Sequence, residues 1–239
     1  MTKFDIKLHN GRRTFSTLSN LPETEVSGLQ WDRAIILIHG FPDVNTTFNK
    51  AWPYLEDSFA GEKVLLLAPK LRGYEKSSIG PESEYALPYL AEDVKAWIEE
   101  INPGNKKPVH LLGHDWGAMV SFKTANLYPH LVTSIVTLAI PYLANLHLWD
   151  LLWYAPEQFY LSSYFLTMQI ASVYRPKLTE SNDYLKHLFR PFSLVKSRWP
   201  VDFNRVPTLI LVGKEDGCMS PRIAELEKEK LKDFPKAEY

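Results

Sequence analysis

Residues 109–120 read VHLLGHDWGAMV, and they predict a buried strand, a tight turn and the start of a helix. Val109–Leu112 is a short apolar run, and an apolar pattern of helical spacing follows the turn. Gly113 and Gly117 bracket the turn, because glycine allows a reversal that is too tight for other side chains. Asp115, at the centre, is therefore expected to project from the carboxyl end of a sheet, where α/β folds bind ligands.

Asp115 fits two roles, a nucleophile and a helix cap. A carboxylate with an ordinary pKa of about 3.9 is ionised at neutral pH, so it needs no base to attack an sp³ carbon and form an alkyl ester. The start of a helix also favours the negative charge. Asp is equally a preferred N-cap residue, so the five residues favour the nucleophile without excluding the cap.

The rest of the chain predicts an α/β fold around this turn. Short apolar runs, typical of a parallel sheet that is buried on both faces, occupy residues 34–38, 64–68, 109–112, 135–139 and 208–212. Between them lie helical patterns, and in residues 90–101 the apolar positions share one face while Asp and Glu fill the opposite face. Phe4–Leu8 and Arg13–Phe15, joined by Asn10-Gly11, predict an antiparallel hairpin before the parallel strands.

Composition excludes several classes of protein. The 239 residues are 45% hydrophobic, which is enough for one core with a modest insertion. Basic and acidic residues number 27 and 28, so no basic field invites nucleic acid. Cys218 is the single cysteine, which excludes a disulfide framework and a cysteine-built metal site. The first residues lack the apolar core of a signal peptide, and no membrane span is expected, so we expect a cytoplasmic protein.

A helical insertion interrupts the alternation of strands and helices. Residues 141–205 contain no strand-like run and are rich in Leu, Tyr, Trp and Phe at helical spacing. The predicted organisation is a core over residues 1–140, a helical cap over residues 141–205 and the returning core over residues 206–239.

A second loop is expected beside Asp115. His39-Gly40-Phe41-Pro42 follows the first run of the parallel set. Such a loop can present the backbone N–H of Phe41 beside that of Trp116, and two donors of this kind hold a developing oxyanion. A plain Gly-Pro turn is the alternative interpretation.

With these residues, the sequence resembles the α/β-hydrolase superfamily and, within it, the epoxide hydrolases. The resemblance runs from about residue 4 to residue 239 and rests on four blocks, which are residues 39–42, 71–77, 113–117 and 206–216. It implies an α/β-hydrolase fold with a helical cap. It also implies hydrolysis of a small apolar epoxide to a diol through an ester on Asp115, without a cofactor or a metal.

The resemblance further implies roles for residues outside the two loops. Asp216 corresponds to the carboxylate that orients a catalytic histidine. Tyr164, five residues before Gln169, matches the cap tyrosine that donates to the epoxide oxygen, although a packing role competes. Where the family has a second tyrosine, this chain has Phe189, so Tyr184 is the candidate substitute. Tyr184, Gln169 and Pro42 are the candidate substrate-binding residues.

The family's general base is a histidine after the final strand, and no histidine follows Asp216 here. The histidines are His9, His39, His110, His114, His130, His147 and His187. Each fits a structural position better than a base within reach of the hydrolytic water. We therefore expect the sequence to stop before the last strand and helix of the fold. We also expect the chain alone to form the ester but turn over poorly.

Two other functions remain open at this point. A haloalkane dehalogenase shares the Asp-Trp pair, and the indole N–H of Trp116 would hold halide, but Phe41 occupies one usual place of the second halide donor. A catalytically inactive binding protein with the same fold is the non-enzymatic alternative, because a fold does not guarantee activity.

Overall fold

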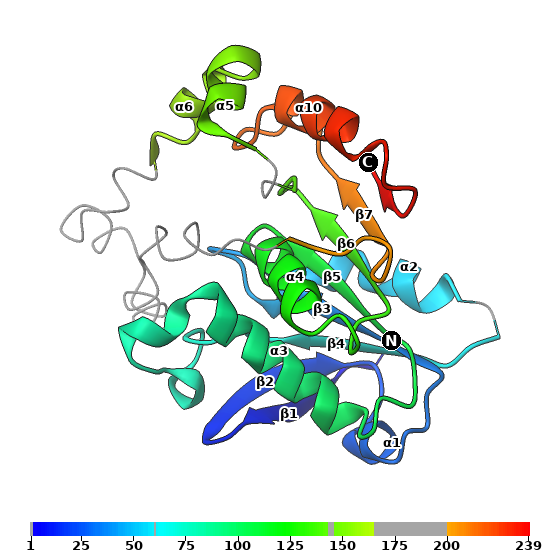
Figure 1. Ribbon diagram of the computed structural model, residues 1–239. Coiled ribbons are helices and arrows are strands. Elements are labelled where there is room, and N and C mark those ends of the chain that lie inside the picture. Colours follow the sequence, from blue (N-terminus) through cyan, green and yellow to red (C-terminus); the bar gives the residue numbers. More distant parts are fainter. Residues whose placement is uncertain (1, 60, 143–145, 165–199) are drawn as a thin grey trace.

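The computed structural model describes residues 2–59, 61–142, 146–164 and 200–239. Its sheet has eight strands in the order β1-β2-β4-β3-β5-β6-β7-β8 (Figure 1). The strands are β1 (Phe4–Asn10), β2 (Arg13–Ser19), β3 (Arg33–Ile38), β4 (Val64–Pro69), β5 (Val109–His114), β6 (Ser134–Leu138), β7 (Thr208–Leu211) and β8 (Ala237–Glu238). β1 and β2 form the expected antiparallel hairpin, and β3 to β8 pair in parallel, so the predicted α/β sheet is confirmed.

The helices lie between the strands as the alternation predicts. They are α1 (Glu23–Ser27), α2 (Trp52–Asp57), α3 (Leu87–Ile101), α4 (Trp116–Leu127), α5 (Leu148–Tyr154), α6 (Glu157–Leu161) and α10 (Pro221–Leu231), with the 3₁₀ turns η1 (Asn45–Lys50), η2 (Lys76–Ser78) and η3 (Glu82–Tyr85). α3 and α4 cover one face of the sheet (Figure 1), whereas α5 contacts α10. Within the described ranges, no helix combines the length and the apolarity that a membrane crossing needs.

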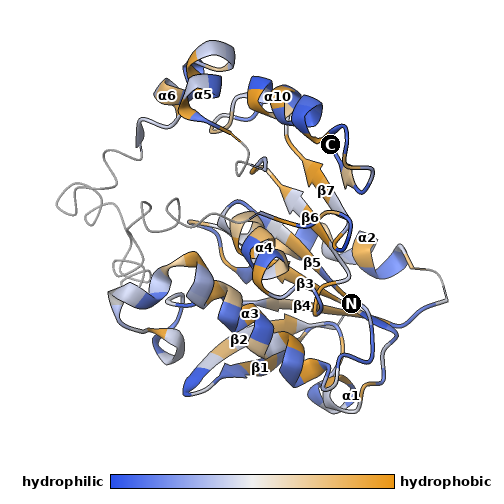
Figure 2. Ribbon diagram, viewed as in Figure 1, coloured by the Kyte–Doolittle hydropathy of each residue, from blue (hydrophilic) through white to orange (hydrophobic). Residues whose placement is uncertain are grey.

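The central strands β3 and β4 are buried on both faces. Alternate residues of β3, such as Ile36, enter the main core beneath α3 and α4, and those between them, such as Ile35, enter a smaller core with Phe48 and Trp52. Both kinds of residue are apolar, as the strands in Figure 2 show, because successive side chains of a strand point to opposite faces. This confirms the expectation drawn from the continuous apolar runs.

In β5, β6 and β7 only every second residue is fully buried. Val109 and Leu111 enter the main core, while His110 and Leu112 are half-buried. Among the described residues, the smaller core reaches β5 only at Leu112. The expectation of burial on both faces is therefore wrong for these three strands, although they contain the predicted apolar runs.

One acidic residue of α3 departs from the predicted solvent-facing stripe. Asp93 is 1% exposed and receives two hydrogen bonds from Arg72, from Nε to Oδ2 at 2.8 Å and from Nη2 to Oδ1 at 2.7 Å. Asn10 donates to the same carboxylate at 2.7 Å. Arg72 is also 1% exposed, and a buried guanidinium requires a charged partner. That tertiary requirement explains why the expected exposure of Asp93 is wrong.

A short strand at the edge of the sheet, β8, pairs in parallel with β7. Ala237 pairs with Thr208 and Glu238 with Leu209, and the N–H of Thr208 donates to the carbonyl of Lys236 at 2.8 Å. A strand of two residues has no periodicity, so it could not be recognised from its sequence.

Candidate active site

The turn between β5 and α4 places Asp115 at the carboxyl end of the central strand. Its backbone has φ 53° and ψ −119°, a conformation that few non-glycine residues adopt. A Cβ on Gly117 would lie 1.9 Å from the carbonyl oxygen of Ile38, so α4 approaches β3 more closely than any side chain permits. The close approach holds the strained turn in place, and strain of this kind concentrates at functional sites.

The carboxylate of Asp115 accepts hydrogen bonds from two backbone donors. The N–H of Phe41 donates to Oδ2 at 2.9 Å, and the N–H of Trp116 also donates to the carboxylate. Burial raises the pKa of Asp115, and these two hydrogen bonds offset only part of that increase. The structure thus brings together the three residues predicted for the nucleophile and the oxyanion hole.

A buried histidine fixes the loop that carries Phe41. The ring of His39 accepts the N–H of Leu71 at Nε2, at 3.0 Å, so the ring proton lies on Nδ1 and donates to the carbonyl of Gly40 at 2.9 Å. Burial lowers the pKa of His39 to about 4, which keeps the ring neutral. Tyr74 donates to the same carbonyl at 3.1 Å. His39 therefore has the structural position expected from the sequence.

The loop of Gly40 and Phe41 leaves space for the carboxylate of Asp115. Beside that carboxylate, the rings of Phe41 and Trp116 form an apolar surface, the Phe41–Trp116 wall. A Cβ on Gly40 would lie 2.4 Å from Oδ2 of Asp115, so only glycine fits there. The Phe41 ring stacks on Trp116 with centroids 5.3 Å apart. Pro42, the next residue, is exposed and joined to Phe41 by a cis peptide bond.

Tyr164 follows α6 and lies close enough to both predicted carboxylates to be affected by their charges. Burial of the phenol raises the pKa of Tyr164 to about 12. The neighbouring charges of Cys218, Asp115 and Asp216 act in the same direction. With this pKa the phenol is protonated at neutral pH, and because the residue is 39% exposed it is also accessible.

Asp216 lies in the loop between β7 and α10. Its Oδ1 accepts the N–H of Cys218 at 2.7 Å and that of Met219 at 2.9 Å, which orients the carboxylate within its own loop. Across the part of the chain that the structure describes, no hydrogen bond joins Asp216 to a histidine. His114, beside the nucleophile, lies with Nδ1 3.5 Å from Oδ2 of Asp43.

A family model described as the alpha/beta hydrolase fold matches residues 33–169, more than half of the chain. The chain belongs to the α/β-hydrolase-fold family. The match includes the loop of Phe41, the turn of Asp115 and the segment up to Tyr164.

Among curated proteins, this α/β-hydrolase-fold chain is similar to epoxide hydrolases. It is 28% identical to epoxide hydrolase 4 of Mus musculus over 242 residues, covering 84% of this chain and 64% of the relative. It is 34% identical to an epoxide hydrolase of Neurospora crassa over 109 residues, covering 45% of this chain and 30% of the relative. The chain thus spans less than two thirds of the length of either relative.

Solved structures support the fold of the α/β-hydrolase-fold chain. An epoxide hydrolase variant from Bacillus megaterium matches with a TM-score of 0.66 and 16% identity, covering 98% of this chain and 90% of that one. A variant of the Solanum tuberosum enzyme matches with a TM-score of 0.65 and 16% identity, covering 100% of this chain and 91% of that one. At this identity the likeness establishes the arrangement of the elements and nothing finer.

Two predicted site residues of the α/β-hydrolase-fold chain, Gln169 and Tyr184, lie outside the described residues.

A different residue of the insertion, Gln158, contacts the loop of Asp216 and was not predicted from the sequence. It lies on α6 and is 5% exposed. No signal in the sequence could have revealed it, because its partners lie about 60 residues away and are backbone atoms.

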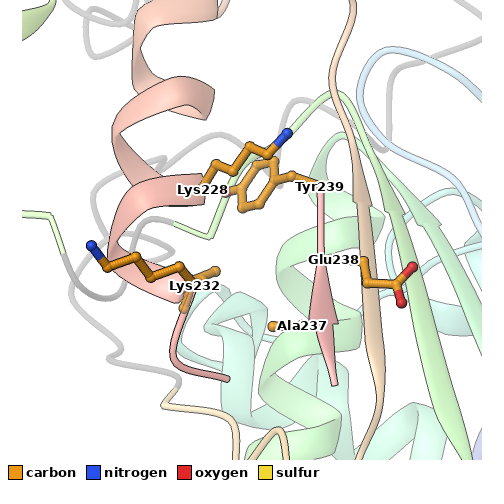
Figure 3. A pocket seen from close by; sticks show the side chains of 6 residues that line it. Lys228, Lys232, Ala237, Glu238 and Tyr239 are labelled. Carbon is orange, nitrogen blue, oxygen red and sulfur yellow. The ribbon is translucent and has the colours of Figure 1, made fainter. Parts of the chain in front are cut away.

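The α/β-hydrolase-fold chain also has a cavity away from Asp115. The cavity measures about 360 Å³ between α10 and β8 and is lined by Lys228, Leu231, Lys232, Ala237, Glu238 and Tyr239 (Figure 3). None of the predicted site residues lines it. Within the described ranges, no group of three or more His, Cys, Asp or Glu side chains is arranged to hold a metal ion.

Proposed function

We propose that this α/β-hydrolase-fold protein opens an epoxide by forming an alkyl ester on Asp115. The observation that carries the proposal is the pair of backbone N–H groups on the carboxylate of Asp115, that of Phe41 on Oδ2 at 2.9 Å and that of Trp116. The hydrogen bond from Phe41 holds Oδ2 in place, and Oδ1 is the proposed attacking atom. The names of the curated relatives support the same reaction class.

The ring-opening step uses Asp115 and Tyr164. Oδ1 of Asp115 attacks an epoxide carbon, the bond between that carbon and the ring oxygen breaks, and the electron pair moves to the oxygen. Tyr164 supplies the proton, since its raised pKa keeps the phenol protonated until an alkoxide, which is a stronger base, develops beside it.

The second step would release a diol. In the proposed ester, Oδ2 is the carbonyl oxygen, which already accepts the N–H of Phe41, and the N–H of Trp116 also donates to this carboxyl group. When water attacks the carbonyl carbon, the negative charge develops on Oδ2, where those donors stabilise it. Asp216 would orient a histidine base that deprotonates this water, but no histidine follows Asp216 in the given sequence, so we propose that these residues alone release the diol poorly. Release of the diol by the whole protein is part of the proposal.

The proposed division of the chain assigns a separate task to each part. Residues 1–140 and 206–239 form the core that carries the nucleophile, the oxyanion donors and Asp216. Residues 141–205 form a cap that brings Tyr164 over the nucleophile. The Phe41–Trp116 wall suits a small apolar epoxide, with Pro42, Gln169 and Tyr184 as further substrate-binding candidates.

Incubation with an aryl epoxide tests the proposal. We expect the intact mass to increase by one epoxide per chain, and peptide mapping to place the ester on Asp115. The result that contradicts the proposal is unlabelled protein, or label on another residue only. Unlabelled protein would favour the inactive binding protein.

A matched variant separates the epoxide reaction from the haloalkane reaction. Tyr164→Phe should slow adduct formation with the epoxide by at least about 100-fold, because the general acid is lost. A chloroalkane releases halide and needs no phenol. Chloride release by the parent chain, unchanged in Tyr164→Phe, would favour the dehalogenase.

The rate of adduct formation should depend on pH through Asp115. Burial raises the pKa of Asp115, and only the ionised carboxylate is a nucleophile. The rate should therefore fall on acidification, with a midpoint above the ordinary aspartate value. Tyr164, with a pKa of about 12, should cause no loss up to about pH 10. The rate of adduct formation, measured by mass spectrometry over a range of pH, checks both the loss at acidic pH and the absence of loss at alkaline pH.

A further inference from the structure

The side-chain amide of Gln158 makes a two-point contact with the loop that follows Asp216. Its Oε1 accepts the N–H of Ser220 at 2.7 Å, and its Nε2 donates to the carbonyl of Cys218 at 2.9 Å. Nε2 also donates to Oγ of Ser162 at 2.8 Å. Since the N–H of Ser220 can only donate, the orientation of the amide is fixed, and its remaining N–H groups have acceptors.

The loop held by Gln158 is the one that orients Asp216. The N–H groups of Cys218 and Met219 donate to Oδ1 of Asp216. Gln158 binds the carbonyl of Cys218 and the N–H of Ser220 in the same loop. Two points of contact define both the position and the direction of a loop backbone. A shift of Gln158 would therefore move the donors on which Asp216 rests.

The same helix leads directly to Tyr164. Gln158 lies on α6, and its bond to Ser162 ties its amide to the short turn before Tyr164. The neighbouring Glu157 reinforces the contact, because Oγ of Ser220 donates to its carboxylate, and Arg222 lies 3.6 Å from it. One side chain thus contacts both the turn before Tyr164 and the loop that carries Asp216.

We propose that Gln158 is a positioning residue that fixes Tyr164 and Asp216 relative to each other and hence to Asp115. The proposal rests on the proposed function, since it assigns Gln158 to the same reaction. It involves no contact between Gln158 and substrate. Misplacement of a catalytic group by about 1 Å costs up to about 100-fold in rate, so a residue of this kind affects the chemical step rather than binding.

Two variants of the 239-residue chain separate the hydrogen bonds from the packing. Gln158→Met keeps the length of the side chain and removes all three hydrogen bonds of the amide, including the two to the loop after Asp216. Gln158→Glu keeps the shape, but an ionised carboxylate faces the carbonyl of Cys218, whereas a protonated one donates to it and restores the contact. Burial against that carbonyl raises the pKa of the introduced acid, so restoration occurs as pH falls.

The readout is the rate of ester formation on Asp115 with an aryl epoxide, resolved into a saturating rate and a half-saturating concentration. At about pH 8, both variants should show a saturating rate about tenfold below the parent, with the half-saturating concentration changed less than about twofold. Toward about pH 5.5, the ratio of Gln158→Glu to parent should rise toward one, while that of Gln158→Met stays constant. Taking the ratio cancels the effect of Asp115 protonation.

Gln30 provides the control, because it is an exposed glutamine remote from the site, and Gln30→Glu should match the parent at every pH. Equal saturating rates in parent and both variants, or a Gln158→Glu ratio independent of pH, would overturn the positioning role while leaving the proposed function intact. A parent chain that forms no ester would overturn the proposed function and this inference with it. Should Gln158→Met fail to fold, the pH-dependent ratio of Gln158→Glu decides alone.

Discussion

Asp115→Asn is expected to lower the rate of ester formation by at least about 10⁴-fold, which is effectively to zero. Asparagine has the shape of aspartate and retains an oxygen for the N–H groups of Phe41 and Trp116, so the turn should persist. What disappears is the charge on the attacking atom, and a neutral amide oxygen is a poor nucleophile toward carbon. Intact mass after incubation with an aryl epoxide measures the loss.

The control for this variant is Asp57→Asn, which makes the same chemical change at an exposed aspartate on α2. It should form the ester at the parent rate. A mass check for deamidation is required, because conversion of the introduced asparagine to aspartate would restore the nucleophile. An adduct of undiminished yield in intact Asp115→Asn protein would show that another residue is the nucleophile.

The second large effect concerns stability. Arg72→Leu should lower the free energy of unfolding by about 3–5 kcal/mol, since it leaves the carboxylate of Asp93 buried without its partner. It also removes the donors that serve the carbonyls of Glu84 and Tyr89, at 3.0 Å and 3.2 Å. Urea unfolding at neutral pH measures the change.

Two further variants define the origin of that loss. Arg72→Leu combined with Asp93→Leu should recover much of the stability, because no unpaired buried charge remains. Lys95→Ala removes one partner of an exposed ion pair with Glu99, 2.6 Å long, and should cost less than about 0.5 kcal/mol. A loss in Arg72→Leu no larger than that in Lys95→Ala would contradict a structural role for the buried pair.

Local sequence patterns predicted the parts of the fold that depend on neighbouring residues. The apolar run at residues 34–38 became β3, and the glycines around Asp115 predicted the turn at the end of β5. Burial of Asp93 and the two-point contact of Gln158 depend instead on Arg72 and on the loop after β7. Because side chains choose such partners in three dimensions, no local pattern encodes them.

In the candidate active site, too, local patterns predicted some residues and not others. Phe41 and Trp116 were predicted beside Asp115 because each has a fixed place relative to its own strand. Tyr164 could be assigned only through the family resemblance, since an aromatic residue in an aromatic-rich segment is otherwise indistinguishable from packing. The two residues of β8 carry too little pattern for any prediction.

At Gly117, α4 packs very closely on β3, and Gly40 packs very closely on Asp115. The backbone around position 115 therefore has a fixed shape. Its shape is set by two glycines and two backbone N–H groups, none of which depends on which side chain stands there. A residue that tolerates the strained backbone would project from the same point onto the same donors. One substitution at position 115 can therefore change the reaction while the surrounding backbone stays the same. The reaction and the fold can then evolve separately.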